Sequence, residues 1–161
     1  MQIFPTIGFY VNVQVIQDQF FISINTTSVE KLVIDFIAFH GLKFDEAAIH
    51  YVDTPTICDL HREFFDDPTT TDCISFPMDD DEDVDVGYKV LGEVFVCPET
   101  AVDYVKINGG DIYREITLYT VHGLLHLLGY DDIEEEDRLQ MRAEEARYLA
   151  HVESKGLWLK S

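Results

Sequence analysis

The chain has 161 residues, of which 47% are hydrophobic and 12% aromatic, with only 9 Gly and 5 Pro. These values fit one domain over residues 1–161 with its own hydrophobic core, and they exclude disordered, collagen-like and low-complexity proteins. The charge is strongly acidic, because 31 Asp and Glu residues outnumber 11 Lys and Arg, for a formal net charge of -20. Nonspecific attraction of nucleic acid by a global basic field is therefore excluded, whereas cations are attracted.

The cysteines and the start of the chain indicate a cytoplasmic protein. Cys58, Cys73 and Cys97 are odd in number and form no CxxC pair, which is typical of reduced thiols. The first residues lack the positively charged segment of a signal peptide. No stretch approaches the roughly 20 apolar residues of a transmembrane helix. We therefore expect a soluble, cytoplasmic protein.

The first 41 residues predict strands followed by a helix. Residues 8–16 alternate apolar and polar side chains, as a half-buried strand does, and a second β-rich piece covers residues 20–24. A helix is predicted over residues 29–40, because its apolar residues recur at spacings of three and four. Residues 25–28 offer several N-caps, and Gly41 is the expected stop.

The next segment alternates between strands and a short helix. Residues 48–52 and 72–77 are rich in residues that favour strands. Between them a helix is predicted over residues 55–65, because Pro55 suits a first helical turn and Thr54 can serve as its N-cap.

The second half of the chain predicts a loop, a strand and two helices. Residues 79–85 hold six acids in seven positions, which is typical of an exposed loop, and a longer strand is predicted over residues 88–97. The helix over residues 111–128 is apolar nearly all round in its second half, so it should be buried on most sides. A charged helix over residues 133–152 has four acids at its N-terminal end, where the helix dipole favours them.

The irregular mixture of strands and helices predicts an α+β fold. We expect a small mixed sheet of about four strands, packed around the buried helix over residues 111–128, with further helices outside. No internal repeat is found in the sequence.

The buried helix carries a candidate metal site. His122 and His126 are four residues apart, which places both imidazoles on one helix face with Cβ atoms about 5–6 Å apart. Gly129 allows the left-handed turn that ends the helix, and a reversal there can bring Asp132 back over the same face. Three such ligands with one open position hold catalytic zinc. The alternative interpretation is two hydrogen-bonded core histidines.

The residue after the first histidine bears on the reaction type. It is Gly123, whereas a zincin protease needs a glutamate there as its general base. Peptidase chemistry of the zincin type is therefore disfavoured.

Three segments of the chain resemble the YbeY family of bacterial endoribonucleases. Residues 122–132, HGLLHLLGYDD, are similar to the family signature HGxLHLxGYDH. Upstream, residues 71–77 (TDCISFP) resemble the family strand TDVLSFP, and residues 91–99 (LGEVFVCPE) resemble LGDIVICPE. The likeness spans roughly residues 45–150.

The resemblance implies a single-strand-specific, metal-dependent endoribonuclease that matures the 3' end of 16S rRNA and takes part in ribosome quality control. It implies one zinc ion per chain, held by His122, His126 and Asp132, and a water activated by that ion. The implied partners are single-stranded rRNA and the small ribosomal subunit or a ribosomal protein, with no membrane. Two alternatives stay open: a catalytically weak, metal-stabilised ribosome-assembly factor, and a metallohydrolase acting on another substrate.

Two positions depart from the family pattern. The third ligand is usually histidine, and Asp132 in its place partly neutralises the ion, which makes it a weaker Lewis acid; Asp131 could compete as the ligand. The family also carries an arginine, thought to meet substrate phosphate, where this chain has Phe65. Arg62, one helical turn earlier, could point the same way. The alternative for Arg62 is an ordinary exposed ion pair.

The remaining cations of interest lie on the last predicted helix. Arg138, Arg142 and Arg147 could form a local basic strip, or they could pair with nearby glutamates on the same helix, which the spacing favours. We therefore expect RNA to be delivered by the ribosome, or by a ribosomal protein with a basic surface.

Overall fold

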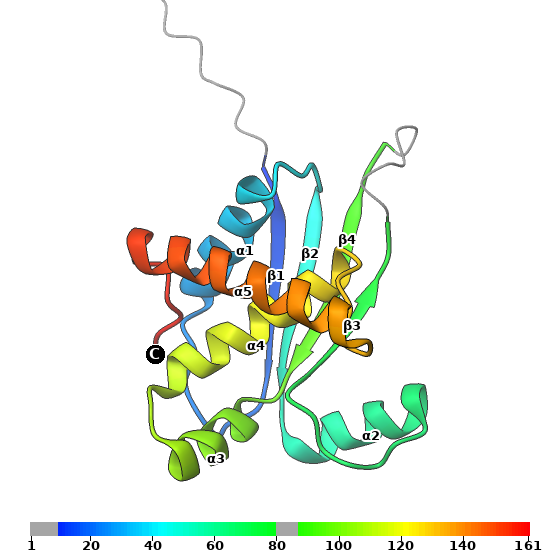
Figure 1. Ribbon diagram of the computed structural model, residues 1–161, viewed down its shortest axis with the longest axis vertical. Helices are drawn as coiled ribbons and strands as arrows, with labels where there is room; N and C mark the ends of the chain where they lie inside the picture. Colours follow the sequence, from blue (N-terminus) through cyan, green and yellow to red (C-terminus); the bar gives the residue numbers. More distant parts are fainter. Residues whose placement is uncertain (1–9, 80–86) are drawn as a thin grey trace, which may run out of the picture.

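The computed structural model describes residues 10–79 and 87–161 (Figure 1). The strands in this part of the chain are β1 (Asn12–Asp18), β2 (Glu46–Val52), β3 (Cys73–Pro77) and β4 (Val90–Val96). They form a mixed sheet in the order β1-β2-β4-β3. β2 pairs in parallel with β1 and β4, whereas β3 and β4 are antiparallel.

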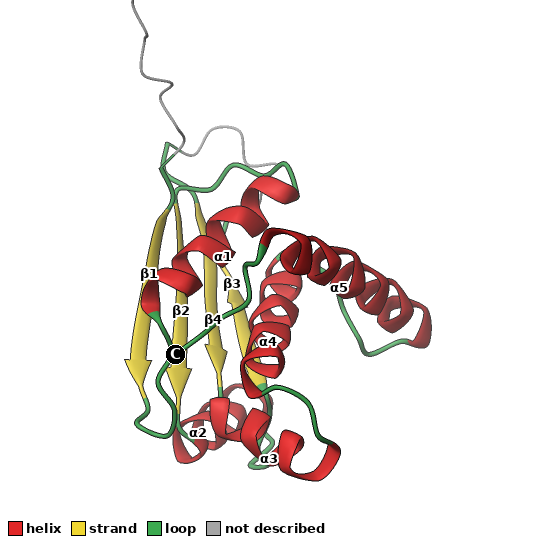
Figure 2. Cartoon of the chain, turned by 90° about the vertical axis from the view of Figure 1, so that its left-hand side faces the viewer, coloured by secondary structure: helices red, strands yellow, loops and turns green. Residues whose placement is uncertain are grey.

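Helices cover one face and one end of this sheet. They are α1 (Thr26–Phe39), α2 (Thr54–Phe65), α3 (Pro98–Asn108), α4 (Ile112–Leu127) and α5 (Glu135–Lys155). α1 and α4 lie against the same face of the sheet, and α5 packs on the outside of α4 (Figure 2). α2 and α3 lie near the end of the sheet at which β1, β2 and β4 finish (Figure 2). None of the described helices combines the length and the hydropathy needed to cross a membrane.

The main hydrophobic core lies between the sheet and the helices α1 and α4. Its fully buried members include Ile49, Val94 and Val96 from the sheet and Leu124 and Leu125 from α4. Each such side chain contributes about 1.5–3 kcal/mol relative to an exposed one. The core therefore holds α4 firmly against β3 and β4, which fixes the position of the histidines that α4 carries.

The α+β class and the four-stranded mixed sheet are confirmed, but the predicted strand over residues 20–24 is wrong. The Gln19 side chain accepts hydrogen bonds from the backbone N–H groups of Phe21 and Ile22, and its amide donates to the Ile22 carbonyl. These bonds close a turn and occupy the groups that a strand would pair. The predicted first strand is β1, shifted to start at Asn12; residues 8 and 9 lie outside the described residues.

Two helices begin earlier than predicted; the N-cap of α1 is one of the predicted candidates, whereas the N-cap of α2 is not. α1 begins three residues earlier than predicted, because the Asn25 side chain accepts a hydrogen bond from the Ser28 N–H. The N-cap of α2 is Asp53, whose Oδ1 accepts from the Thr56 N–H at 3.0 Å; the prediction of Thr54 is wrong. The Thr54 hydroxyl instead donates to Glu99.

Helix α3 is absent from the predicted elements. Its buried residues are only Pro98, Ala101 and Val102, so the apolar periodicity is too short to predict a helix. The available signals were a proline followed by an acid at the start, and Gly109 at the end. Of the predicted acidic loop, residues 80–85 lie outside the described residues.

Candidate metal centre

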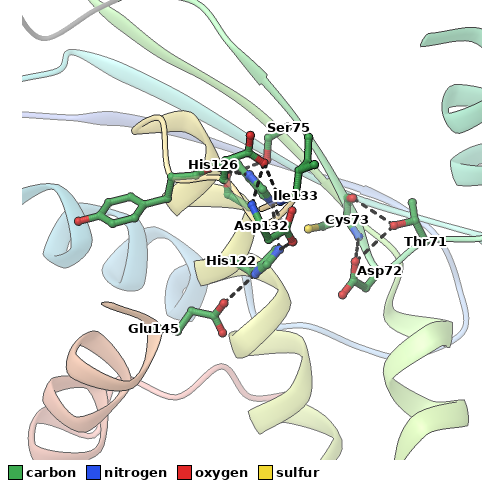
Figure 3. Close-up of polar contacts among 12 residues, drawn as sticks. Thr71, Asp72, Cys73, Ser75, His122, His126, Asp132, Ile133 and Glu145 are labelled. Atoms are coloured by element: carbon green, nitrogen blue, oxygen red, sulfur yellow. Dashed lines mark hydrogen bonds and ion pairs between the residues drawn. The ribbon is translucent and has the colours of Figure 1, made fainter. Parts of the chain in front are cut away.

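The end of α4 and the turn after it bring the three predicted ligands together. His122 and His126 lie on the last turns of α4. Gly129 follows with a φ of 95°, a conformation that glycine adopts without strain, and its N–H donates to the His126 carbonyl at 3.0 Å. The chain then reverses, so that Asp132 returns over the face that carries the two imidazoles (Figure 3).

The ligand atoms of these residues converge on one point. The two Nε2 atoms of His122 and His126 are 3.1 Å apart. The Asp132 Oδ2 atom lies 3.3 Å from the first and 3.8 Å from the second. In a tetrahedral zinc site, ligand bonds of about 2.0–2.1 Å place the ligand atoms roughly 3.3 Å apart. The observed separations are therefore close to those of a site that holds one ion.

The hydrogen bonds of the imidazoles define which nitrogen carries the proton. His122 Nδ1 lies 2.8 Å from the Glu145 carboxylate, and His126 Nδ1 lies 2.9 Å from the Tyr130 carbonyl oxygen. Because both oxygens only accept, each Nδ1 carries a hydrogen, and each neutral imidazole presents a lone pair at Nε2. Two lone pairs and the Asp132 carboxylate then face one another. Such a donor set needs a cation, which fits a metal ion.

The charges around His122 favour a cation. Burial alone would lower the pKa of His122, but the hydrogen bond and the charge of Glu145, together with Asp72 and Asp132, raise that pKa above its ordinary value. In the absence of a metal ion, this environment favours a proton on the ring. A metal ion and that proton compete for the same position, as is usual for histidine ligands.

The three side chains lie in a cleft of about 520 Å³. One wall comes from α2, with His61 and Phe65, and another comes from residues 71–75, at and just before the start of β3. The Ser75 hydroxyl donates to the Gly123 carbonyl at 2.7 Å, so β3 is fastened directly to the helix turn between the two histidines.

The close packing around Gly123 explains why this position of the helix carries no side chain. A Cβ atom there would lie 2.3 Å from Val94 Cγ1, which is far inside van der Waals contact. The general base that a zincin needs after its first histidine could not fit in this helix packing. The packing at Gly123 therefore also disfavours zincin chemistry.

The other two candidate residues, Arg62 and Asp131, are engaged in contacts of their own. Arg62 is exposed on α2 and pairs with Asp59 at 2.7 Å; it is not among the residues that line the cleft, although Phe65 is. The Asp131 Oδ1 atom accepts from the backbone N–H groups of Asp132 and Ile133, so its carboxylate is engaged in the turn.

The arginines of α5 fall into two groups. Arg147 pairs with Glu144 at 2.6 Å, as the spacing predicts. Arg138 and Arg142 instead line a small hollow of about 90 Å³ together with His122, Asp132 and Glu145. These two arginines therefore line a hollow that adjoins the ligand set.

Sequence reasoning missed the partners that orient the imidazoles. From the spacing, the glutamates of the last helix are predicted only as partners of arginines on that helix, and Glu145 is one of them. Its contact with His122 spans 23 positions and depends on how α5 packs over α4, so no local pattern signals it. The contact between the Tyr130 carbonyl and His126 results from the turn at Gly129, so the predicted turn was the available signal for it.

The fold and the site define an α+β protein with a candidate His2Asp metal centre in a cleft. A sequence model of the family described as Endoribonuclease YbeY matches residues 13–153. The chain therefore belongs to the YbeY family, which confirms the resemblance found in the sequence.

Individual relatives agree with this assignment. The chain is 55% identical over 116 residues to Endoribonuclease YbeY of Protochlamydia amoebophila (strain UWE25), which covers 72% of this chain and 76% of the relative. It is 35% identical over 148 residues to Endoribonuclease YbeY of Chlamydia pneumoniae, covering 90% and 93% of the two chains. The solution structure of TM1509 from Thermotoga maritima has a similar fold, with a TM-score of 0.61 and 22% identity over 89% of this chain and 90% of that one.

Proposed function

We propose that this protein is a single-strand-specific, zinc-dependent endoribonuclease that acts in the cytoplasm on the 3' end of 16S rRNA and in ribosome quality control. Membership of the YbeY family supports the RNA substrate and the hydrolytic reaction. The observation that carries the proposal is the convergence of two imidazole lone pairs and one carboxylate on the floor of a cleft.

In this proposal, His122, His126 and Asp132 hold one zinc ion. The chemistry that zinc supplies at such a site is Lewis acidity, which polarises a phosphoryl oxygen and makes hydroxide available near neutral pH. Glu145 and the Tyr130 carbonyl accept hydrogen bonds from the Nδ1 atoms of the two imidazoles and so direct their Nε2 atoms into the cleft. The Asp132 carboxylate adds a negative charge, which strengthens the hold on the ion but weakens its Lewis acidity.

Arg62 is proposed as a contact for substrate phosphate. It lies one helical turn before Phe65, which lines the cleft, and its guanidinium is exposed. To reach a phosphate, it must exchange the Asp59 carboxylate for the substrate. Because both are exposed, this exchange costs little, about 0–1 kcal/mol.

The acidic surface implies that RNA does not bind through long-range attraction. With a net charge of -20, the protein repels RNA at a distance. We therefore propose that the small ribosomal subunit, or a ribosomal protein with a basic surface, presents the single strand to the cleft.

The test compares His126→Ala with His151→Ala. The side chains of His126 and His151 are similarly exposed, at 27% and 22%, so the second variant controls for the loss of a partly buried imidazole. Zinc-loaded wild type should cleave single-stranded RNA but neither duplex RNA nor peptides. His126→Ala should lose this cleavage, whereas His151→Ala should keep it.

Two results would favour the alternatives. If His126→Ala stays folded and cells that carry it still mature precursor rRNA normally, the protein is a metal-stabilised assembly factor. If the zinc-loaded protein cleaves another phosphate or amide substrate but not RNA, it is a different metallohydrolase.

A further inference from the structure

A second hollow adjoins the metal cleft. It has a volume of about 550 Å³ and shares His126, Gly129 and Tyr130 with the cleft, so the two hollows adjoin each other at these residues. The apolar part of its lining comes from Leu42, Phe44, Met78, Leu127 and Leu128.

Two polar side chains of this hollow, His40 and Asp79, are already engaged. Both ring nitrogens of His40 have partners, the Phe36 carbonyl and the Glu144 carboxylate, each at 2.8 Å. The Asp79 carboxylate accepts from the Val90 N–H at 2.7 Å. Among the described residues, the lining includes neither lysine nor arginine. An anionic phosphate is therefore a poor ligand here, whereas a flat, neutral ring matches the lining.

We propose that this hollow binds the base of the nucleotide next to the scissile phosphate. The inference rests on the proposed endoribonuclease function. Since His126 forms part of both hollows, a phosphate at the metal ligands places one adjacent nucleotide beside the apolar lining. RNA-binding proteins commonly hold unpaired bases against aromatic side chains, and the half-buried Tyr130 side chain lines this hollow.

The subsite also accounts for the selection of single strands. A base in a duplex is stacked and paired, so it cannot enter a side hollow without first leaving the helix. An unpaired base does not have this cost. The proposed preference for single-stranded RNA then results from the side chains that line this hollow.

The test measures cleavage of a short single-stranded oligoribonucleotide in which one base at a time is removed. In the wild type, we expect one position next to the scissile phosphate where base removal raises KM about tenfold. Met78→Ser should raise KM for intact RNA about fivefold, because the apolar wall is reduced. In that variant, base removal at the same position should cost less than in the wild type.

Leu139→Ser is the matched control. Leu139 is 62% exposed and Met78 is 63% exposed, and Leu139 lines neither hollow, so KM should not change. If every base can be removed with less than about a twofold change in KM, or if both serine variants behave alike, the subsite is wrong. If the zinc-loaded wild type neither binds nor cleaves the intact RNA, the proposed function fails as well.

Discussion

The Glu145 carboxylate on α5 lies 2.8 Å from Nδ1 of His122 on α4 and so ties the outer helix to the metal centre. The bond fixes the orientation of the ring and the nitrogen that carries its proton. Partners of this kind also raise the basicity of the ligand nitrogen. α5 therefore takes part in the site, although it supplies no ligand itself.

Replacing Glu145 with alanine should lower zinc affinity by about 10–100-fold, because the His122 ring loses the acceptor that orients it. Competition with a chromogenic chelator measures this change. Glu144→Ala is the matched control, because the Glu144 and Glu145 side chains are 13% and 14% exposed and Glu144 contacts His40 and Arg147 instead. Equal zinc affinities in the two variants would contradict the role of Glu145 in orienting the His122 ring.

Asp132 and Asp131 are adjacent but should respond differently to substitution. Asp132→Asn should weaken zinc binding by at least about two orders of magnitude, since it removes the anionic ligand. Asp131→Asn should leave the affinity within about threefold, because its remaining side-chain oxygen can still accept the turn hydrogen bonds. The reverse order of the two affinities would identify Asp131 as the third ligand.

Gly123→Ala should destabilise the protein by about 1–3 kcal/mol, even though alanine favours helices. The added methyl group would press on Val94 in the core. Urea unfolding measures the effect, and the same substitution in a Val94→Ala background should cost less, because the clash is relieved. A Gly123→Ala variant as stable as the wild type would contradict the close packing of α4 on β4.

The Glu144 contacts predict a pH-dependent stability. Its hydrogen bond to Arg147, opposed by burial and aided by His40, lowers the pKa of Glu144 below its ordinary value. A lowered pKa contributes stability above the unfolded-state value of about 4.5, and that stability is lost as the pH falls through the lower folded-state value.

Urea unfolding of Glu144→Gln measures this contribution. The variant should be less stable than the wild type by about 1 kcal/mol at pH 7, and the difference should shrink toward zero near pH 3. Glu63→Gln, at an exposed position on α2, should match the wild type at both pH values. A difference that stays constant with pH would mean that the ionised Glu144 carboxylate does not contribute to the stability of the fold.

Arg62→Gln should lower kcat/KM for single-stranded RNA about tenfold without changing zinc affinity, if the exposed guanidinium contacts phosphate. Arg142→Gln is the informative comparison, because Arg142 lies in the hollow that contains His122 and Asp132. A loss of activity only in Arg142→Gln would move the phosphate contact from α2 to α5.

The parts of this molecule that local spacing determines could be predicted from the sequence. The histidines four residues apart, the glycine turn and the returning aspartate all lie within 11 consecutive residues, and the structure groups them as their spacing suggests. The strand predicted over residues 20–24 failed because the Gln19 side chain takes the backbone hydrogen bonds, which apolar content does not reveal.

Long-range packing accounts for the rest. The position of Glu145 beside His122 and the hollow beside His126 both depend on how separate elements meet. The ion pair of Arg62 with Asp59, by contrast, is a local contact within α2, and it is the alternative that the sequence left open for Arg62.

The most direct test of the metal centre is the metal content of protein purified without chelator, measured for the wild type, His122→Ala and Asp132→Ala. The wild type should contain one equivalent of zinc, and both variants should contain almost none while remaining folded. A wild type without bound metal, or variants that keep a full equivalent, would contradict the assignment of these three side chains as ligands.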